Sequence, residues 1–246
     1  MDRGVIERIV SYAELSIDDR VLEIGPGTGN LTDALAARAG TVFAIEVDPG
    51  LAAGLQKHYE SQRLQRSRDG SQNVVVLSGD ALKVELPSYN KIVSNLPYQI
   101  SSKITYRLLS RPFDMAVLMY QKEFVRRMTA IPGQKEYGRM GMVVGYLCQA
   151  EILEIVSRSA FKPMPEVESA IVRLMPREHL VDARRFIKFA DALFNSRRKK
   201  LKNALASMGF SRDSLAMVDE ALLDKRPEEL SPQEAASLLL KFDNCS

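Results

Sequence analysis

The 246-residue chain contains no tryptophan, two cysteines and two histidines. Two histidines, His58 and His179, are too few to support a histidine-rich metal site or a Ser-His-Asp triad. The two cysteines lie far apart in the sequence and indicate no disulfide framework. Cys148 stands in an apolar stretch and is expected to be a small core residue. We therefore expect chemistry that needs no metal ion.

The chain also lacks a long apolar run and a signal-peptide pattern. These absences lead us to expect a soluble, cytoplasmic protein without a membrane partner. Hydrophobic residues nevertheless make up 46% of the sequence. At this length, that share suffices for the core of one large domain and one small domain.

The net charge of +3 is too small to indicate nucleic acid by itself, but its distribution is uneven. Lys103 to Arg139 holds eight basic residues against three acidic ones, and Arg177 to Lys202 holds nine against three. Such clusters suit a phosphate backbone, although basic residues also simply solvate helix faces. Around one helical turn, neighbouring cations repel one another unless an anion lies nearby. We predict that the cations of one such segment face RNA: Arg197, Arg198, Lys199, Lys200 and Lys202.

Strand and helix patterns alternate along the first half of the chain. A helix is expected at residues 5–13, and alternation continues to a strand at 115–119, which is typical of a parallel sheet. A charged helix end and an exposed loop are expected between Gln56 and Gln72. These patterns predict one sheet-containing domain that begins at the amino end of the chain.

The second half changes character. A helix is expected around 140–148, and the β-rich runs 152–156 and 170–175 predict a hairpin with a long loop. Beyond Pro176 strand signals cease, and apolar residues recur at helical spacing. We therefore divide the chain into residues 1–176 and a helical domain at 177–246. The apolar residues that carry this helical pattern include Phe186, Phe189, Leu193, Leu201 and Leu205.

Three glycines separated by single residues follow a predicted buried strand at 21–24. They are Gly25, Gly27 and Gly29, and a helical stretch begins directly after them. Glycine permits positive φ and lets a ligand approach the backbone closely. The spacing is one residue short of the last gap of the dinucleotide fingerprint, which weakens a pyrophosphate interpretation. An ordinary strand-to-helix turn is the alternative.

Acidic residues end the next two predicted strands. Glu46 comes about twenty residues after the glycines, where an acidic residue typically binds a ribose diol. Asp80 follows the strand at 73–77 and can accept from the amine of a cofactor adenine. The alternatives are a solvated strand end for Glu46 and a helix N-cap for Asp80. One nucleoside pocket explains them better, because open α/β sheets bind ligands at the carboxyl ends of their strands.

The motif Asn95-Leu96-Pro97-Tyr98 follows the apolar run 92–94. Asn95 Oδ1 and the carbonyl oxygen of Leu96 or Pro97 can accept the two N–H groups of an adenine amine. Tyr98 can stack on the ring and fix its plane. The expected reaction is group transfer to a base nitrogen. The alternative is an ordinary turn after a strand.

Taken together, these motifs resemble the S-adenosylmethionine-dependent adenine dimethyltransferases of small-subunit rRNA, the kasugamycin-resistance type. The resemblance covers nearly the whole chain. It rests on the ordered set of motifs, because the glycine turn alone fits any class I methyltransferase. Further matching segments are Tyr120–Phe124, Ile131–Gly133, Tyr137–Arg139, Phe161–Pro165 and Phe194–Leu201.

The resemblance implies an α/β fold of the class I methyltransferase type, with a Rossmann-like mixed seven-stranded sheet and a small C-terminal helical domain that binds RNA. It implies that S-adenosylmethionine donates two methyl groups to each of two adjacent adenines in a hairpin near the 3′ end of small-subunit rRNA. The partner would be that rRNA within a ribosomal subunit or an assembly precursor. We expect a monomer with a role in ribosome biogenesis.

The resemblance also assigns residues. The implied catalytic residues are Asn95, Leu96, Pro97, Tyr98 and Phe161. The implied cofactor-binding residues are Glu23, Gly25, Gly27, Gly29, Glu46, Val47, Asp80, Ala81 and Asn95. Phe161 is expected to sandwich the target adenine against Tyr98, with a buried core phenylalanine as the alternative.

Three residues outside these sets receive weaker assignments. Tyr120 and Gln121 are expected to pack beneath the catalytic loop. Arg139 is expected to contact an RNA phosphate or to pair with Glu136.

Two other substrates or roles stay open. One is adenine methylation of large-subunit rRNA, as in the related antibiotic-resistance enzymes, and the other is a non-catalytic ribosome-assembly or RNA-binding factor. Members of the family that this sequence resembles usually carry an N-terminal extension with a Gln-x-Phe-Leu-type segment, which helps to close over the cofactor. This sequence begins at Met1, already near the first helix. We therefore expect either a trimmed start or a different mode of closure.

Overall fold

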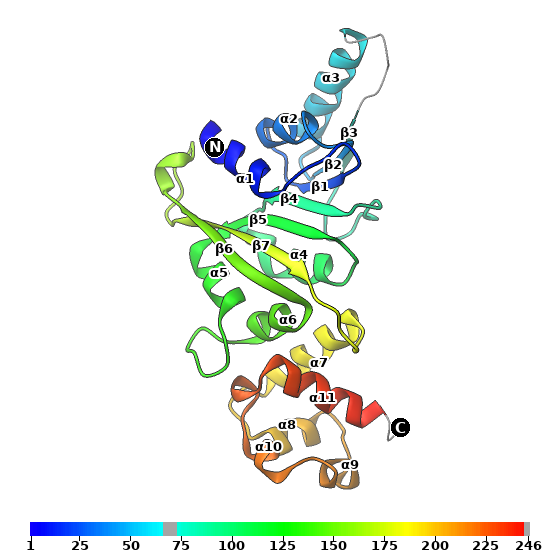
Figure 1. Ribbon diagram of the computed structural model, residues 1–246, viewed down its shortest axis with the longest axis vertical. Coiled ribbons are helices and arrows are strands. Elements are labelled where there is room, and N and C mark those ends of the chain that lie inside the picture. Colours follow the sequence, from blue (N-terminus) through cyan, green and yellow to red (C-terminus); the bar gives the residue numbers. More distant parts are fainter. Residues whose placement is uncertain (66–72, 244–246) are drawn as a thin grey trace. The chain divides into compact units, whose positions relative to one another are not determined.

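The computed structural model describes residues 1–65 and 73–243 (Figure 1). Its strands form one seven-stranded sheet with the order β3-β2-β1-β4-β5-β7-β6. Strands β1 to β5 are parallel, and β7 runs antiparallel to β5. The expected mixed sheet of a class I methyltransferase is thus confirmed. The strands are β1 (Arg20–Ile24), β2 (Thr41–Glu46), β3 (Val74–Ser78), β4 (Lys91–Asn95), β5 (Met115–Gln121), β6 (Cys148–Val156) and β7 (Ser169–Pro176).

The strand order reverses at one place. From β1 the chain proceeds through β2 to β3 in one direction, and β4 then pairs with the opposite side of β1. In an open parallel sheet, a crevice forms at the carboxyl ends of the two strands that flank such a reversal. The glycine turn after β1 and the Asn95 motif after β4 both lie at these ends.

Helices connect the strands. They are α1 (Arg3–Tyr12), α2 (Asn30–Ala36), α3 (Pro49–Gln65), α4 (Ser101–Leu109) and α5 (Lys122–Thr129), with short 3₁₀ turns η1 (Tyr98–Ile100) and η2 (Arg158–Ala160). The first helix begins two residues earlier than predicted, because the Asp2 side chain caps the Gly4 and Val5 N–H groups at 2.9 and 3.3 Å. The loop predicted after α3 lies outside the described residues.

The apolar strands form the core of the sheet. Every residue of β5 from Met115 to Tyr120 is buried, as expected for a central strand covered on both faces. Predicted and observed strands agree for the first five. Strand β6 begins four residues earlier than predicted, since the preceding helix ends at Leu147 and the chain is extended from Cys148.

The chain divides into two compact units. The sheet unit holds Met1–Leu108, Pro112–Val125 and Glu151–Met175, and the helical unit holds Leu109–Arg111, Arg126–Ala150 and Pro176–Ser246. The predicted division at Pro176 assigns residues 109–111 and 126–150 to the sheet domain. In the structure these residues group with the C-terminal helices.

The helical unit has its own core. The five apolar residues predicted at helical spacing are all buried, with Phe186 and Leu193 completely inaccessible. Cys148 is also buried, which confirms its expected core position. The Tyr137 hydroxyl donates to the Leu230 carbonyl at 2.8 Å inside this unit. The helices are α6 (Arg139–Leu147), α7 (Ala183–Asn195), α8 (Leu201–Ser207), α9 (Arg212–Ala216), α10 (Glu220–Asp224), η3 (Pro227–Glu229) and α11 (Pro232–Asp243).

None of the helices within the described ranges combines the length and the apolar character that a bilayer crossing requires.

Candidate active site

The glycine turn connects β1 to α2 through residues with positive φ. Gly25, Gly27 and Gly29 have φ values of +72°, +58° and +85°. A Cβ atom on Gly29 would lie 2.7 Å from Leu55 Cδ2, so a larger residue would displace that side chain and also strain the backbone. By contrast, no atom lies within 4 Å of a Cβ built on Gly27. The turn thus presents open backbone at its centre.

The turn is tied to the end of β2. The Gly25 N–H donates to the Ile45 carbonyl at 2.9 Å, and the Gly27 N–H donates to Glu46 Oε2 at 3.0 Å. Glu46 Oε1 accepts from the Asp48 N–H, also at 3.0 Å. Each carboxylate oxygen keeps further acceptor capacity. The largely buried Glu46 side chain is therefore fixed in place with acceptors still available to a ligand hydroxyl.

Val47 and the end of β3 complete this edge. The Gly79 N–H donates to the Glu46 carbonyl at 2.7 Å, so that the two strand ends are joined. Val47 is 65% exposed, an apolar surface next to polar groups that a flat ring can cover. Asp80 Oδ1 accepts from the Leu82 N–H at 2.9 Å and thereby caps a turn rather than a helix. Ala81 is buried beside it.

Glu23 is a buried acid with a free acceptor. The residue is 2% exposed, and its Oε2 atom has no hydrogen-bond partner within the described part of the chain. Burial, together with the nearby carboxylates of Asp33 and Glu46, raises the pKa of Glu23 to about 8. A buried, unsatisfied carboxyl is costly unless it serves a ligand. A cationic group of a cofactor would satisfy it.

Ser94 joins the ends of β1 and β4 through its side chain. The two strands pair only at Val21 with Lys91 and at Leu22 with Ile92. Beyond that point the Ser94 hydroxyl donates to the Ile24 carbonyl at 2.7 Å and accepts from the Ile24 N–H at 3.2 Å. A side chain thus replaces the backbone ladder, and the strands separate where the two motifs begin.

The Asn95 motif has the acceptors that the sequence predicts. No hydrogen-bond partner for the Asn95 side chain or the Leu96 carbonyl is present among the described residues. The Pro97 carbonyl already accepts from the Ile100 N–H at 3.3 Å and from the Ser101 hydroxyl at 3.4 Å. Of the two carbonyls that the sequence left open, the geometry therefore favours that of Leu96.

The two motifs are in contact. A Cβ atom on Gly25 would lie 3.1 Å from Pro97 Cγ, which means that the proline ring packs directly on the glycine backbone. A side chain at position 25 would push the motifs apart. The structure thus brings the glycine turn and the Asn95 motif into one site.

Two buried hydroxyl groups support the loop from below. The Thr105 hydroxyl donates to the Ser101 carbonyl at 2.7 Å, so its contact of 2.7 Å with the Tyr120 hydroxyl requires the tyrosine to donate. Burial raises the Tyr120 pKa and keeps this phenol protonated. The expected packing of Tyr120 beneath the loop is in accord with these contacts.

The two aromatic residues of the site lie in different surroundings. The Tyr98 hydroxyl is 2.9 Å from Ser169 Oγ, and the Tyr98 side chain is only partly buried. Phe161 follows η2 and packs, partly buried, against the hydrophobic core. A role for Phe161 in stacking stays a prediction.

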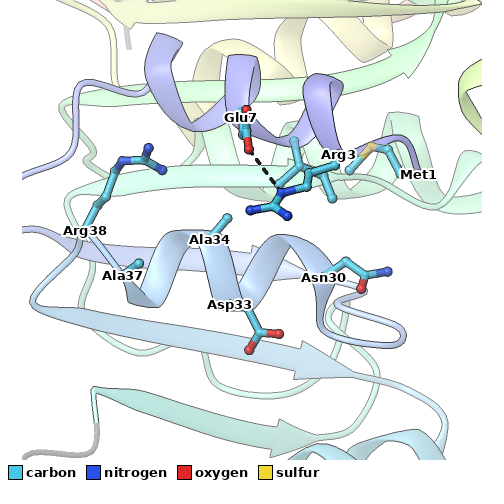
Figure 2. A pocket seen from close by; sticks show the side chains of 9 residues that line it. Met1, Arg3, Glu7, Asn30, Asp33, Ala34, Ala37 and Arg38 are labelled. Carbon is cyan, nitrogen blue, oxygen red and sulfur yellow. Dashed lines mark hydrogen bonds and ion pairs between the residues drawn. The ribbon is translucent and has the colours of Figure 1, made fainter.

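A pocket of 780 Å³ lies between α1 and α2 (Figure 2). Asn30, which follows the glycine turn, lines it together with Arg3, Glu7 and Arg38. Arg3 and Glu7 pair with each other at 3.2 Å, as Figure 2 shows. This pocket therefore adjoins the glycine turn through Asn30.

The predicted RNA-binding cations lie in the helical unit, and three of the five have anionic partners. The segment forms the turn between α7 and α8 rather than a helical turn. Arg197 pairs with Glu228 at 2.5 Å and also donates to the Tyr137 carbonyl. Asp224 lies 2.9 Å from Lys200 Nζ and 3.7 Å from Lys202 Nζ. The nearby anions that such a cluster requires thus come, for these three cations, from the chain itself, and RNA binding by the segment stays a prediction.

The other cations differ. Arg198 and Lys199 are exposed, and no ion pair of either is found within the described ranges. Arg139, expected to contact an RNA phosphate or Glu136, pairs with Asp191 of α7, and its contact with RNA stays a prediction. Arg198 and Lys199 are thus the cations of the segment for which the described residues supply no acidic partner.

Sequence reasoning missed Ser94, Thr105 and Ser169. Ser94 gave a signal, since it is the one polar residue in the run Ile92-Val93-Ser94. Thr105 and Ser169 gave none, because their tyrosine partners lie 15 and 71 positions away.

Comparisons with known proteins agree with this geometry. Residues 1–242 match the family model described as ribosomal RNA adenine dimethylase. The chain is 42% identical over 247 residues to a probable ribosomal RNA small subunit methyltransferase A of Methanosarcina mazei, covering 97% of this chain and 88% of the relative.

Solved structures give the same result. A dimethyladenosine transferase from Plasmodium falciparum matches with a TM-score of 0.82 and 30% identity, covering 98% of this chain and 96% of that one. The 23S rRNA methyltransferase ErmE matches with a TM-score of 0.69 and 31% identity, covering 99% and 98%. The chain therefore belongs to the ribosomal RNA adenine dimethylase family.

Proposed function

We propose that this member of the family transfers methyl groups from S-adenosylmethionine to the exocyclic amines of two adjacent adenines in small-subunit rRNA. The observation that supports this function best concerns two acceptors, Asn95 Oδ1 and the Leu96 carbonyl. Neither has a partner among the described residues, and both lie at the strand reversal next to the glycine turn. They match the two N–H groups of one aromatic amine.

The residues present fit the cofactor. Glu46 would bind the ribose hydroxyls, Val47 would cover the adenine ring, and Asp80 would accept from its amine. The open backbone at Gly27 leaves room for close approach, and the unsatisfied Glu23 carboxyl suits a cationic group. When bound, S-adenosylmethionine supplies a methyl group on a positively charged sulfur that leaves as a neutral thioether.

Positioning supplies most of the rate in this scheme. The adenine amine is a poor nucleophile because its lone pair is delocalised into the ring. Asn95 Oδ1 and the Leu96 carbonyl would hold both N–H groups and aim the lone pair at the methyl carbon. As the nitrogen forms its new N–C bond it gains positive charge, which these oxygens stabilise more strongly than the neutral ground state. A proton then leaves the nitrogen for water.

Aromatic stacking would fix the base. Tyr98 lies directly after the acceptors, and Phe161 lies on the loop between η2 and β7. Stacking on one aromatic ring is worth about 1–3 kcal/mol per base, enough to hold an adenine out of an RNA helix.

The substrate assignment draws on the helical unit and on the relatives. Exposed Arg198 and Lys199 suit phosphate contacts, and the Methanosarcina mazei relative is named for the small subunit. We assign the reaction to a ribosomal subunit or an assembly precursor in the cytoplasm, carried out by a monomer.

Large-subunit rRNA is the second candidate, because ErmE matches over the same length. The higher identity to the relative named for the small subunit, 42% against 31% for ErmE, favours the small subunit.

Labelled S-adenosylmethionine distinguishes the candidates. The protein is incubated with unmethylated small subunits, large subunits, free rRNA and DNA in parallel. We expect label in the small subunit or its rRNA. Label confined to the large subunit would select the second candidate, and no label in any RNA would reject methyl transfer.

A further inference from the structure

Ser169 lies at the start of β7 and is completely buried. Its Oγ atom is 2.9 Å from the Tyr98 hydroxyl. Because Ser169 is fully buried, this contact satisfies a polar atom that burial would otherwise penalise. Its partner is a residue of the Asn95 motif.

The backbone around Ser169 is held firmly. Ser169 is paired with Gln121 in the β5–β7 ladder. The Lys122 N–H donates to the Glu168 carbonyl at 2.9 Å, and Lys122 Nζ lies 2.8 Å from Glu168 Oε2. Ser169 therefore provides a fixed anchor for whatever it binds.

Tyr98, by contrast, is less constrained. It begins the short η1 turn and its side chain is partly exposed. Rotation of a tyrosine side chain about χ1 moves the whole ring and its hydroxyl between staggered positions. A hydrogen bond between the phenol and a buried hydroxyl holds the far end of the ring and so selects one of these positions.

The contact also links the two sides of the proposed adenine site. The loop that carries Phe161 leads from η2 directly into Ser169. Ser169 therefore joins the Asn95 motif to the strand that follows the loop of Phe161.

We propose that Ser169 is a positioning residue, which holds the Tyr98 ring in the place where the target adenine stacks on it. This inference rests on the proposed function of the site. Ser169 acts through Tyr98 and does not touch the reacting atoms.

A double-mutant cycle tests the inference. The variants are Ser169→Ala, Tyr98→Phe and the double variant, with Tyr12→Phe as a control that removes a tyrosine hydroxyl contacting Glu154. We expect each single change to lower kcat on small subunits by roughly threefold to tenfold, the effect of one hydrogen bond, with KM for S-adenosylmethionine unchanged. The double variant should lose no more than the worse single one. Unchanged single variants, or a double loss equal to the product of the single losses, would overturn the inference.

A second readout does not depend on methyl transfer. A 2-aminopurine base at the target position of an rRNA hairpin is quenched when it stacks on tyrosine, and the chain has no tryptophan to interfere. We expect strong quenching by the unaltered protein and weaker quenching by Ser169→Ala and Tyr98→Phe. Equal quenching by all three, or none, would reject the role of Ser169.

The two readouts separate the claims. Lack of label in any RNA with the unaltered protein rejects the proposed function, and quenching then decides the role of Ser169. Normal labelling with full activity of Ser169→Ala rejects the inference alone.

Discussion

The two units of this protein treat their polar groups in opposite ways. At the strand reversal of the sheet unit, Asn95 Oδ1, the Leu96 carbonyl and Glu23 Oε2 have no partner among the described residues. In the helical unit, Arg197, Lys200 and Arg139 all have acidic partners on neighbouring elements. Unsatisfied polar groups at the ends of neighbouring buried strands indicate a ligand, whereas paired charges on a surface indicate mainly structure.

The largest effect is expected at the unpaired amide. Asn95→Ala removes an acceptor that stabilises developing charge, and such removals typically lower kcat by roughly 10²–10³. Methyl incorporation into small subunits measures kcat, and calorimetry should show nearly unchanged affinity for S-adenosylmethionine.

Gln99→Ala is the matched control, because it removes an exposed amide from the same loop. We expect its kcat to stay within about threefold. If Asn95→Ala kept full activity, the unpaired amide of the sheet unit would not serve catalysis. A non-catalytic assembly role would then gain support.

The next effect concerns cofactor affinity. Glu46→Gln replaces a carboxylate oxygen that accepts from a backbone N–H with an amide NH₂ that cannot accept. Losing one charged hydrogen bond should weaken S-adenosylmethionine binding roughly tenfold to hundredfold, as read by calorimetry. An unchanged Kd would show that the ribose lies elsewhere.

Glu23 gives a pH dependence of stability in the cofactor-free protein. Its folded pKa of about 8 exceeds the ordinary value of 4.5, so the folded state keeps a proton that the unfolded state loses. The contribution of this group to stability is complete below pH 4.5. It falls by roughly 1.4 kcal/mol per pH unit up to about pH 8.

Urea denaturation at pH 5 and pH 8 measures this loss. Glu23→Gln should remove most of the difference between the two pH values, whereas the exposed Glu60→Gln should preserve it. Identical pH profiles for all three proteins would contradict a buried, protonated Glu23.

The smallest effects belong to the helical unit. Replacing Arg198 and Lys199 together with alanine should weaken rRNA binding several-fold and reduce the salt slope by about 2, since each phosphate contact contributes about 1. Arg197→Ala should instead lower the free energy of unfolding by at most about 1 kcal/mol, because its pair with Glu228 is half exposed. Filter binding at several salt concentrations separates the two. If Arg197→Ala reduced the salt slope of rRNA binding as much as the double replacement, the paired and unpaired cations would not differ in RNA binding.

Local patterns predicted most of the sheet and its motifs. Apolar runs mark strands, and glycines or acidic residues at their ends mark the site, because these signals act over a few residues. The contact of Ser94 with Ile24 joins residues 70 positions apart, and the contact of Ser169 with Tyr98 joins residues 71 positions apart. No local pattern encodes them.

The basic segment illustrates the same limit. Five cations within eight residues looked unbalanced, yet Asp224 and Glu228 neutralise three of them from elements that follow later in the chain. Charge balance is a property of the folded surface, which sequence windows do not contain.

The central claim is that Asn95 and Leu96 hold the exocyclic amine of adenine. Digestion of methylated small-subunit rRNA to nucleosides, followed by mass spectrometry, identifies the modified atom. The account predicts N6,N6-dimethyladenosine at two neighbouring positions. Methyl groups on ribose, on a ring nitrogen or on another base would contradict it.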